Sequence, residues 1–197
     1  MTRLLAINGS YREGGATDQA VAAATEAAAA AGAAVETVNL RDVPIAFCSN
    51  CRQCGQVPGD APAQCVHQDA MRDLIAGIES ADGLILASPT NLSSVTALFK
   101  RFMERLAVYG YWPWGAPAPT LRRNTRTKKA LLITSSAAPG LLGRIAFSSL
   151  RQLKMTAKTV GAKPVGTVWI GLMSQRPAPE LPPRSRARIQ RLARRLV

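Results

Sequence analysis

Short apolar runs alternate with longer segments of helical periodicity along this chain, and this alternation constrains the fold more than any other feature. Most of the runs have continuous apolar centres, which is typical of strands that are buried on both faces of a sheet. The expected strands are residues 3–8, 34–40, 83–88, 129–135 and 164–170. The expected helices are residues 16–31, 69–80, 93–108, 141–160 and 183–197. The pattern predicts an α/β fold with a parallel sheet between two layers of helices.

The predicted architecture is a three-layer, doubly wound, five-stranded parallel sheet with the flavodoxin-like strand order 2-1-3-4-5. The 197 residues, 47% of them apolar, suffice for one buried core, and no repeat or Gly/Ser linker divides them. We therefore expect a single domain over residues 1–197, with a cysteine-rich loop at 41–66 and a basic C-terminal helix at 183–197. No apolar run reaches the roughly eighteen residues of a membrane span, and no signal peptide is recognisable, so we expect a cytoplasmic location.

Charge is distributed unevenly between the two halves of the chain. The net charge is +13, yet residues 1–99 carry a net −5 and residues 100–197 a net +18. The basic residues concentrate at 122–129 and in the C-terminal helix. An amphipathic helix that docks on the sheet and exposes a basic face explains the second concentration. Binding to nucleic acid or to an anionic surface is the alternative, although no recognised nucleic-acid-binding motif accompanies the charge.

The loop after the first expected strand has the composition of a phosphate-binding loop. Residues 9–17 contain glycines for close backbone approach, hydroxyls at Ser10 and Thr17, and a cation at Arg12. The N-terminus of the following helix adds unpaired N–H groups and the positive end of its dipole. The dinucleotide fingerprint and the lysine-containing phosphate loop are both absent. The alternative interpretation is a plain strand–helix turn in which Ser10 or Thr17 caps the helix.

Two blocks of sequence resemble the NAD(P)H-dependent FMN reductase family. Residues 9–12, Gly-Ser-Tyr-Arg, together with Thr17 are similar to that family's G-S-x-R…[ST] loop. Residues 69–71, 81–89 and 98–105 resemble its D-D-M…A-D-G-I-I-L-x-S-P…L-K-x-F-x-D-R pattern. The two blocks occur in the family's order and spacing and cover most of the chain up to residue 105, and beyond it the resemblance is one of layout.

The resemblance implies a flavodoxin-like fold that binds FMN without a covalent bond. The residues that would contact it are Ser10, Arg12 and Thr17 at the phosphate, Pro89, Thr90 and Asn91 beside the isoalloxazine ring, and Ser135, Ser136 and Gly140 on its other side. Asn91 departs from the family, in which tyrosine is frequent at this position. An ordinary turn at the end of a strand is the alternative interpretation of residues 89–91.

The four cysteines form one compact cluster in the expected loop after the second strand. Their spacing is C-x2-C-x2-C-x10-C, and they are Cys48, Cys51, Cys54 and Cys65. A compact run with a more distant fourth cysteine favours one [4Fe-4S] cluster, and the resemblance extends to the iron–sulfur flavoprotein branch of the family. A zinc site and free structural or redox thiols are the alternatives. His67 would become a ligand only if one cysteine were spared.

Together these features predict an FMN-dependent oxidoreductase, because a flavin supplies hydride and electron chemistry that the chain lacks. The expected donor is NAD(P)H, and the expected acceptor is a flavin, a quinone or an acidic redox protein. An iron–sulfur flavoprotein that only carries electrons is a variant of this prediction, and a basic nucleic-acid- or partner-binding module without redox activity is the alternative. We expect the phosphate loop and the cysteine cluster to lie at the same edge of the sheet.

The segment between the expected third helix and fourth strand is rich in aromatic residues. Residues 109–115 contain two tyrosines and two tryptophans within six positions. Such a segment is suited to covering the flavin, to lining a flat acceptor site, or to forming a subunit contact. The resemblance implies a homo-oligomer, a dimer or a tetramer.

Overall fold

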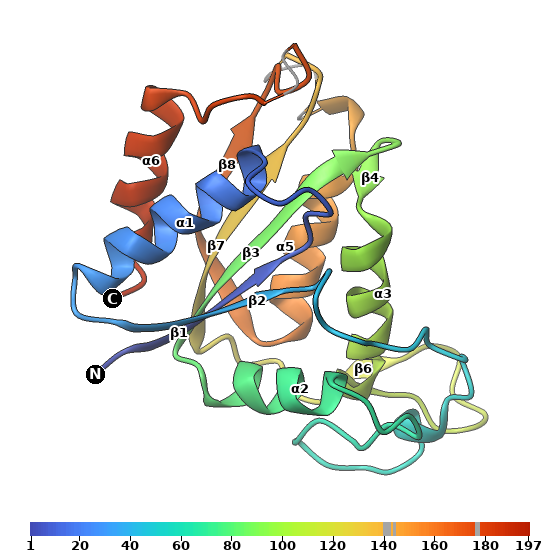
Figure 1. Ribbon diagram of the computed structural model, residues 1–197. Helices are drawn as coiled ribbons and strands as arrows, with labels where there is room; N and C mark the ends of the chain where they lie inside the picture. The colour runs from blue at the N-terminus through green and yellow to red at the C-terminus, as the bar shows by residue number, and fades with distance from the viewer. Residues whose placement is uncertain (140–142, 144, 176–177) are drawn as a thin grey trace.

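A parallel sheet of five long strands forms the centre of the protein (Figure 1). The computed structural model describes residues 1–139, 143, 145–175 and 178–197. The strands lie side by side in the order β2-β1-β3-β7-β8. Their bounds are β1 Arg3–Asn8, β2 Ala34–Asn39, β3 Gly83–Asn91, β7 Lys128–Ser135 and β8 Ala162–Ile170. Counted along the chain this is the order 2-1-3-4-5, so the flavodoxin-like prediction is confirmed.

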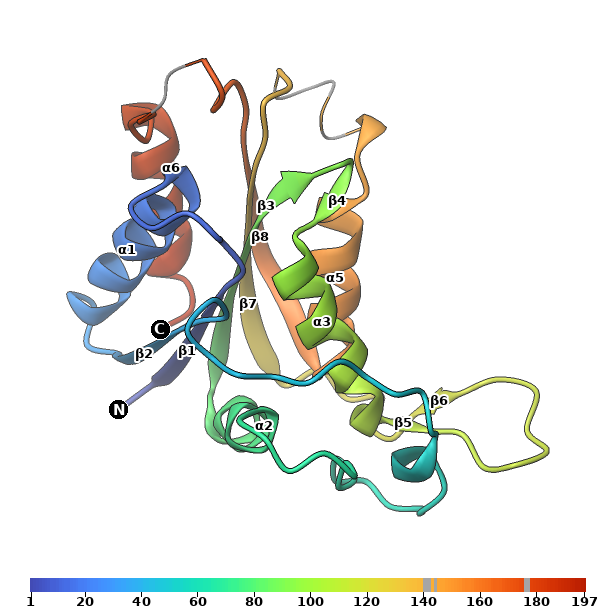
Figure 2. The ribbon, with the colours of Figure 1, turned by 45° about the vertical axis from the view of Figure 1, so that its right-hand side comes forward.

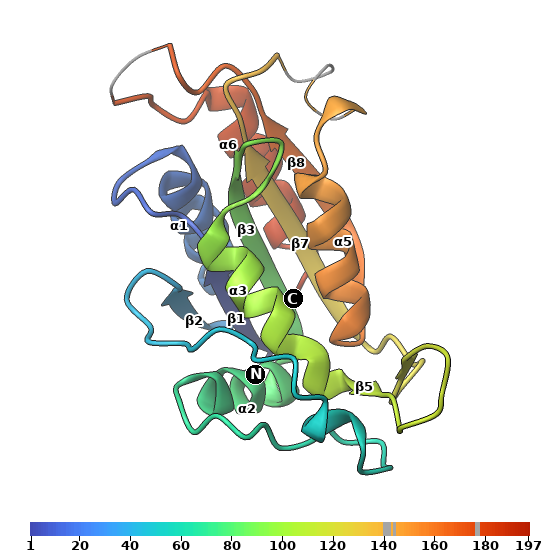
Figure 3. The ribbon, with the colours of Figure 1, turned by 90° about the vertical axis from the view of Figure 1, so that its right-hand side faces the viewer.

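Helices cover both faces of this sheet, as Figures 1 and 3 show. One layer consists of α1 (Ala16–Ala29) and α6 (Pro183–Ala193). The other layer consists of α2 (Met71–Ser80), α3 (Ala97–Arg105) and α5 (Ser149–Thr159). Alternate residues of each strand enter different cores, because successive side chains of a strand point to opposite faces.

Strand β1 illustrates this division between the two cores. Its residues Leu4 and Ala6 pack with the buried alanines of α1 and with Ile189 of α6. Its residues Leu5 and Ile7 pack with α2 and α3 instead. Both faces of the strand are therefore buried, which explains its continuous apolar centre.

The turn after β3 differs from the sequence prediction and shortens the helix that follows. β3 runs to Asn91 and folds back onto the short antiparallel strand β4 (Ser94–Val95). Leu92 and Ser93 between them have φ values of 42° and 64°, as a two-residue hairpin turn requires. The helix expected from residue 93 therefore begins only at Ala97.

The start of α3 is tied to the loop that follows β1. Thr96 is its N-cap, because its hydroxyl oxygen accepts from the Phe99 N–H, and it also donates to the Gly9 carbonyl at 2.6 Å. A Cβ atom at Gly9 would lie 2.8 Å from the Cβ of Phe99. Glycine is therefore required where the loop crosses the helix.

Two further segments differ from the sequence prediction: an expected loop contains two short strands, and an expected helix is shorter. Residues 109–126, expected to be a loop, contain a small antiparallel pair of strands, β5 (Gly110–Tyr111) and β6 (Thr120–Leu121). Of the helix expected at 141–160, residues 141, 142 and 144 lie outside the described residues, residues 147–148 are not helical, and α5 covers Ser149–Thr159. In the part of the chain that the structure describes, every helix is too short or too polar to cross a bilayer.

Candidate functional site

A polar cavity of about 400 Å³ lies at the carboxyl ends of the strands. Four separate segments line it: the loop after β1, the end of β3, the loop after β7, and the chain between β8 and α6. The lining includes eight of the nine residues predicted to contact FMN, namely Ser10, Arg12, Thr17, Pro89, Thr90, Asn91, Ser135 and Ser136. The ninth, Gly140, lies outside the described residues. The structure thus brings residues more than 120 positions apart into one site.

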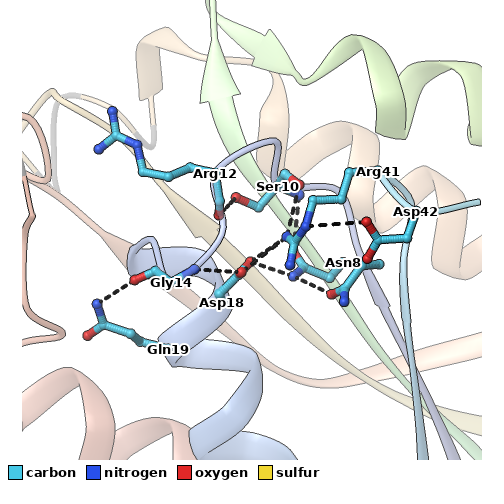
Figure 4. A network of polar contacts seen from close by, with 9 residues as sticks. Asn8, Ser10, Arg12, Gly14, Asp18, Gln19, Arg41 and Asp42 are labelled. Atoms are coloured by element: carbon cyan, nitrogen blue, oxygen red, sulfur yellow. Dashed lines mark hydrogen bonds and ion pairs between the residues drawn. The ribbon is translucent and has the colours of Figure 1, made fainter.

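The loop after β1 is held in shape by a network centred on Asp18 (Figure 4). The Asp18 carboxylate accepts from Asn8 Nδ2 at 2.7 Å, from the Gly14 N–H at 3.0 Å and from Arg41 Nη1 at 3.1 Å. The Asn8 amide oxygen accepts from the Ser10 N–H at 3.1 Å, and Arg41 also donates to the Ser10 carbonyl. In Figure 4 the Arg12 side chain points away from this network. The loop backbone is therefore fixed by contacts that leave the cavity side to a ligand.

The N-terminus of α1 faces the same cavity. Its N-cap is Gly15, which offers no side-chain hydrogen bond to the first turn. The interpretation of Ser10 or Thr17 as a cap is therefore wrong. Thr17 is instead hydrogen bonded to Ser135 through the two hydroxyl oxygens, 2.9 Å apart, and Ser10 donates to the Arg12 carbonyl at 3.0 Å. An uncapped helix N-terminus beside buried hydroxyls is a ready site for a phosphate.

The opposite wall of the cavity is built by β3 and β7. The Thr90 hydroxyl lies 2.7 Å from that of Ser149 and 3.3 Å from that of Thr134. Ser136 donates its N–H to the Ile170 carbonyl at 2.9 Å, and its hydroxyl accepts from the Trp169 indole N–H at 3.1 Å. These bonds fix the positions of polar groups along the wall.

The segment between β8 and α6 completes the cavity, and the sequence analysis did not identify it. Met173, Ser174 and Pro179 line the site. Gln19 of α1 holds this segment, because its side-chain amide donates to the Pro179 carbonyl and accepts from the Leu181 N–H. No local sequence signal marks these residues, since only the packing of α6 beside α1 brings them to the cavity.

The four cysteines line a second cavity, of about 370 Å³. Its other lining residues include Met103, Leu106 and Trp112, so much of its wall is apolar. It lies at the C-terminal end of α3, whereas the first cavity lies at the end where this helix begins. Figures 2 and 3 show the loops that form it projecting from that far end.

The prediction that the two sites share one edge of the sheet is therefore wrong. The nine residues of α3, about 13 Å long at 1.5 Å per residue, separate them. The loop after β2 leaves the carboxyl edge and runs to the opposite end of this helix. No regular backbone ladder holds it, so its path is decided by side-chain contacts with distant segments.

The thiols of this cavity influence one another. All four cysteines are free, and Cys51 is exposed while the others are half-buried. Burial, together with the nearby Cys65, Cys48 and Cys51, raises the pKa of the Cys54 thiol. The Gln53 N–H and the Ser49 side chain lower the pKa of the Cys51 thiol by hydrogen bonding. Within the described residues no three His, Cys, Asp or Glu side chains are already arranged around a metal ion.

Arg52 attaches the aromatic segment to the cysteine loop. Its guanidinium lies 3.7 Å from the ring centre of Trp112 and 4.3 Å from that of Trp114, and it donates to the Trp112 carbonyl at 3.1 Å. The Gly55 carbonyl accepts from the Trp112 N–H at 2.9 Å. The suggestion that this segment covers the flavin site of its own chain is therefore wrong.

Arg122 binds the cysteine loop through its backbone carbonyl groups. It donates to the carbonyls of Cys54, Val57 and Gly59 at 2.8, 2.8 and 3.1 Å, and to that of Val108 at 2.9 Å. The sequence indicated only a basic surface here. The acceptors are main-chain oxygens up to 68 residues away, for which a sequence gives no signal.

Comparisons with known proteins identify the family of this chain. The family model described as NADPH-dependent FMN reductase matches residues 2–173. An iron-sulfur flavoprotein of Archaeoglobus fulgidus is 33% identical over 111 residues, which are 56% of this chain and 48% of that protein. An iron-sulfur flavoprotein of Methanosarcina thermophila is 28% identical over 103 residues, or 52% of this chain and 51% of that protein. The chain thus spans about half the length of the curated relatives it matches.

Solved structures resemble this fold at low sequence identity. The crystal structure of an azoreductase from Bacillus anthracis gives a TM-score of 0.75 at 14% identity, covering 99% of this chain and 100% of that one. These values show a common fold.

Proposed function

The chain belongs to the NADPH-dependent FMN reductase family, and from this premise we propose that it is an FMN-dependent oxidoreductase that takes reducing equivalents from NAD(P)H. The observation that carries the proposal is the cavity at the carboxyl edge, where eight of the nine expected FMN contacts come together.

The residues of the phosphate loop fit the phosphate of FMN. Ser10 and Thr17 are 3% and 2% exposed and present hydroxyls at an uncapped helix N-terminus. Arg12 lines the same cavity and supplies a positive charge. Charge-assisted hydrogen bonds to a phosphate are about twice as strong as neutral ones. We assign these three residues to the phosphate.

The wall formed by β3 and β7 would hold the isoalloxazine ring. Pro89, Thr90 and Asn91 line this wall at the end of β3, and Ser135 and Ser136 lie beside them at the end of β7, where Pro89 is paired with Ser135. When bound, the flavin supplies the hydride and electron chemistry, while these residues orient it and exclude water.

Comparing FMN with riboflavin tests the phosphate assignment. Riboflavin lacks the phosphate, so Arg12→Gln should weaken FMN binding about tenfold or more and leave riboflavin binding within about twofold of wild type. Both affinities are measured by quenching of flavin fluorescence. A matched control is Arg3→Gln, which removes an arginine from the start of β1, away from the cavity lining. Equal losses for both ligands would contradict the assignment, and no FMN binding by the wild type would overturn the proposed function.

We propose that Cys48, Cys51, Cys54 and Cys65 hold one [4Fe-4S] cluster. The four thiols line one largely apolar cavity, and four cysteine thiolates are the usual ligands of such a cluster. Anaerobic purification followed by iron, sulfide and zinc analysis tests the assignment. About four irons and four sulfides per chain are expected for a cubane cluster. One zinc per chain, or no metal after reconstitution, would contradict it.

The basic helix α6 fits an acidic redox protein as the electron acceptor. Its exposed arginines are Arg184, Arg186, Arg188 and Arg191. The helix expected at 183–197 ends at Ala193, and the exposed Arg194 and Arg195 follow directly after it. The segment that lines the flavin cavity leads directly into this helix, through Pro179 and Leu181. A partner attracted to this surface would dock near the site, and such attraction mainly raises the association rate.

Salt dependence tests this surface. Reduction of an acidic ferredoxin should slow as ionic strength rises, and Arg184→Gln with Arg188→Gln should flatten that dependence. Arg151→Gln, on α5 at the opposite face of the sheet, is the matched control. A rate insensitive to salt would remove the role of α6.

Anaerobic NADH and NADPH consumption with a quinone distinguishes a reductase from an electron carrier that lacks its own nucleotide site.

We further propose that the chain is one domain located in the cytoplasm and assembles as a dimer or tetramer. The two helical layers pack on a single sheet, which supports the proposal of one domain. Sedimentation of the FMN-loaded protein measures its assembly state, and a monomer at micromolar concentration would contradict the proposed dimer or tetramer.

A further inference from the structure

Arg105, the last residue of α3, is the only charged side chain that is fully buried among the described residues. It is 2% exposed. Removing a charge from water is unfavourable by several kcal/mol unless partners compensate, so the contacts of this guanidinium decide whether its burial is tolerated. In the sequence this arginine is recognisable only as part of a family pattern.

The guanidinium joins the two ends of the cysteine loop. Arg105 donates to both carboxylate oxygens of Asp69, at 2.6 and 3.0 Å, and to the Ala46 carbonyl at 2.8 Å. The Asp69 carboxylate also accepts from the Ala46 N–H at 2.7 Å and from the Met71 N–H at 3.1 Å. Ala46 lies two residues before Cys48, and Asp69 lies four residues after Cys65. The loop that carries all four cysteines is therefore closed at its base by one ion pair.

The same guanidinium also lies near one of the cysteines, Cys65. Arg105 and Cys65 line a common hollow of about 340 Å³ beside α2. Burial acts against the charged form of Arg105, but Asp69 and the neighbouring Cys65 together raise its pKa. Its Nε atom is buried and has no hydrogen-bond partner. Arg105 thus has one unused donor, Nε, while its other nitrogens bind Asp69 and Ala46, and it lies near Cys65, a proposed cluster ligand.

We propose that Arg105 is a positioning residue of the cysteine site, which closes the base of the loop through Asp69 and Ala46 and places a positive charge and a donor beside the Cys65 sulfur. The second part of this inference rests on the proposed iron–sulfur cluster, whereas the closure of the loop does not. A positive charge beside a cluster stabilises its more negative, reduced form, so Arg105 would raise the reduction potential.

Three variants separate the two roles. Arg105→Gln removes both the ion pair and the charge, Arg105→Lys keeps the charge but loses the two-pronged contact, and Asp69→Asn breaks the ion pair while leaving the arginine. Lys100→Gln is the matched control, because it removes a positive charge from an exposed position of the same helix. Near- and far-ultraviolet circular dichroism identifies any variant that fails to fold, and Arg105→Lys then carries the test in place of Arg105→Gln.

The first measurement is hydrogen exchange of the metal-free protein over residues 46–66. We expect exchange about tenfold faster or more in Arg105→Gln and Asp69→Asn, an intermediate effect in Arg105→Lys, and no change in Lys100→Gln. Unchanged exchange in the first two variants would overturn the clamp. This arm remains decisive if the wild type proves to bind no cluster, an outcome that contradicts only the proposed cofactor.

The second measurement is the reduction potential of the reconstituted cluster, followed by electron paramagnetic resonance. Arg105→Gln should have a lower potential than wild type, while Arg105→Lys and Asp69→Asn, which retain the positive charge, should not fall as far. If Arg105 only closed the loop, its variants would speed hydrogen exchange, but their reduction potentials would not depend on whether the positive charge is kept. Equal potentials in wild type and Arg105→Gln would therefore overturn the assignment of the charge.

Discussion

The flavin cavity and the cysteine cavity are similar in volume but differ in how they are built. The first lies where parallel strands end and a helix begins, so β3, β7 and α1 form part of its wall. Side-chain contacts of Asp18 and Gln19 hold the loops that complete it. The second lies among irregular loops at the opposite end of α3. Its shape depends on three arginines, Arg52, Arg105 and Arg122, which donate to carbonyl groups of distant segments.

This difference teaches which mutations matter at each site. A loop without a ladder leaves its carbonyl groups to side chains, because buried backbone groups must find partners. The removal of one arginine then frees several carbonyls at once. In the flavin cavity, a single side chain carries less of the structure, since the sheet and α1 remain. The comparison predicts large structural effects in the cysteine loop and mainly binding effects at the flavin cavity.

The largest effect is expected for Arg122→Ala. The change removes donors to four carbonyl groups, three of them in the cysteine loop, and should lower the free energy of unfolding by about 2–3 kcal/mol. Most of the bound iron should be lost, while FMN affinity stays within about twofold, because the flavin cavity does not contain Arg122. Chemical denaturation, iron analysis and flavin fluorescence measure these quantities. A large loss of FMN affinity would break the comparison. Arg126→Ala removes a nearby exposed arginine and serves as the control.

The next effect concerns the response of the clamp to acid. Burial favours the neutral form of Asp69, but hydrogen bonds from Arg105, Ala46 and Met71 outweigh it and lower its pKa from 3.8 to about 2. The folded protein therefore binds this proton more weakly than the unfolded chain. The stabilisation, about 2 kcal/mol, is fully present above the unfolded pKa and is lost as the pH falls through 4 toward 2. Denaturation of wild type and Asp69→Asn between pH 6 and about 2.5 measures the difference. The two curves should converge at the acid end, and a constant gap would contradict the assignment.

A smaller effect is expected at the flavin cavity for Asp18→Asn. The change weakens the acceptor that holds Asn8, Gly14 and Arg41, so the phosphate loop should lose order and FMN should bind about tenfold more weakly. Hydrogen exchange of residues 46–66 should not change. Asp42→Asn is the control, because Asp42 is exposed and meets Arg41 only at 3.8 Å. Faster exchange in the cysteine loop would show that the two regions are coupled.

The smallest effect is expected for Trp114→Ala. Trp114 is 64% exposed and contributes one of the two rings that enclose Arg52. An exposed cation–π contact is worth about 0.5–1 kcal/mol. Thermal unfolding should shift slightly, whereas the same change at the half-buried Trp112 should have a larger effect. A reversed order would mean that the exposed ring, rather than the enclosed one, holds the two loops together.

The family pattern shows both the reach and the limit of sequence reasoning. Asp69 and Arg105 belong to the two ends of the second resembling block, and the sequence identified them only as marks of the family. In the structure they are partners in one ion pair. Their 36-residue separation hides this relation, because it is created by the packing of α3 beside the cysteine loop.

The basic segment before β7 gives a similar lesson. Its charges predicted a surface for anions, yet Arg122 donates to carbonyls and Arg123 pairs with Glu79. Lys128 donates to the Glu79 and Ala81 carbonyls, and burial lowers its pKa. Composition counts charges without showing which ones already have partners, so it overstated the basic surface here and described it correctly only on α6.

The sequence by itself determined the α/β class and the two helical layers, and its resemblance to a known family supplied the residues expected at the carboxyl edge. The physical reason is that apolar periodicity specifies which faces are buried, and a parallel sheet brings the ends of its strands to one edge. Only the tertiary structure decided where the cysteine loop goes, because its path depends on hydrogen bonds from Arg52, Arg105 and Arg122 to distant backbone groups. Those bonds have no local period, so they exist only once the chain has folded.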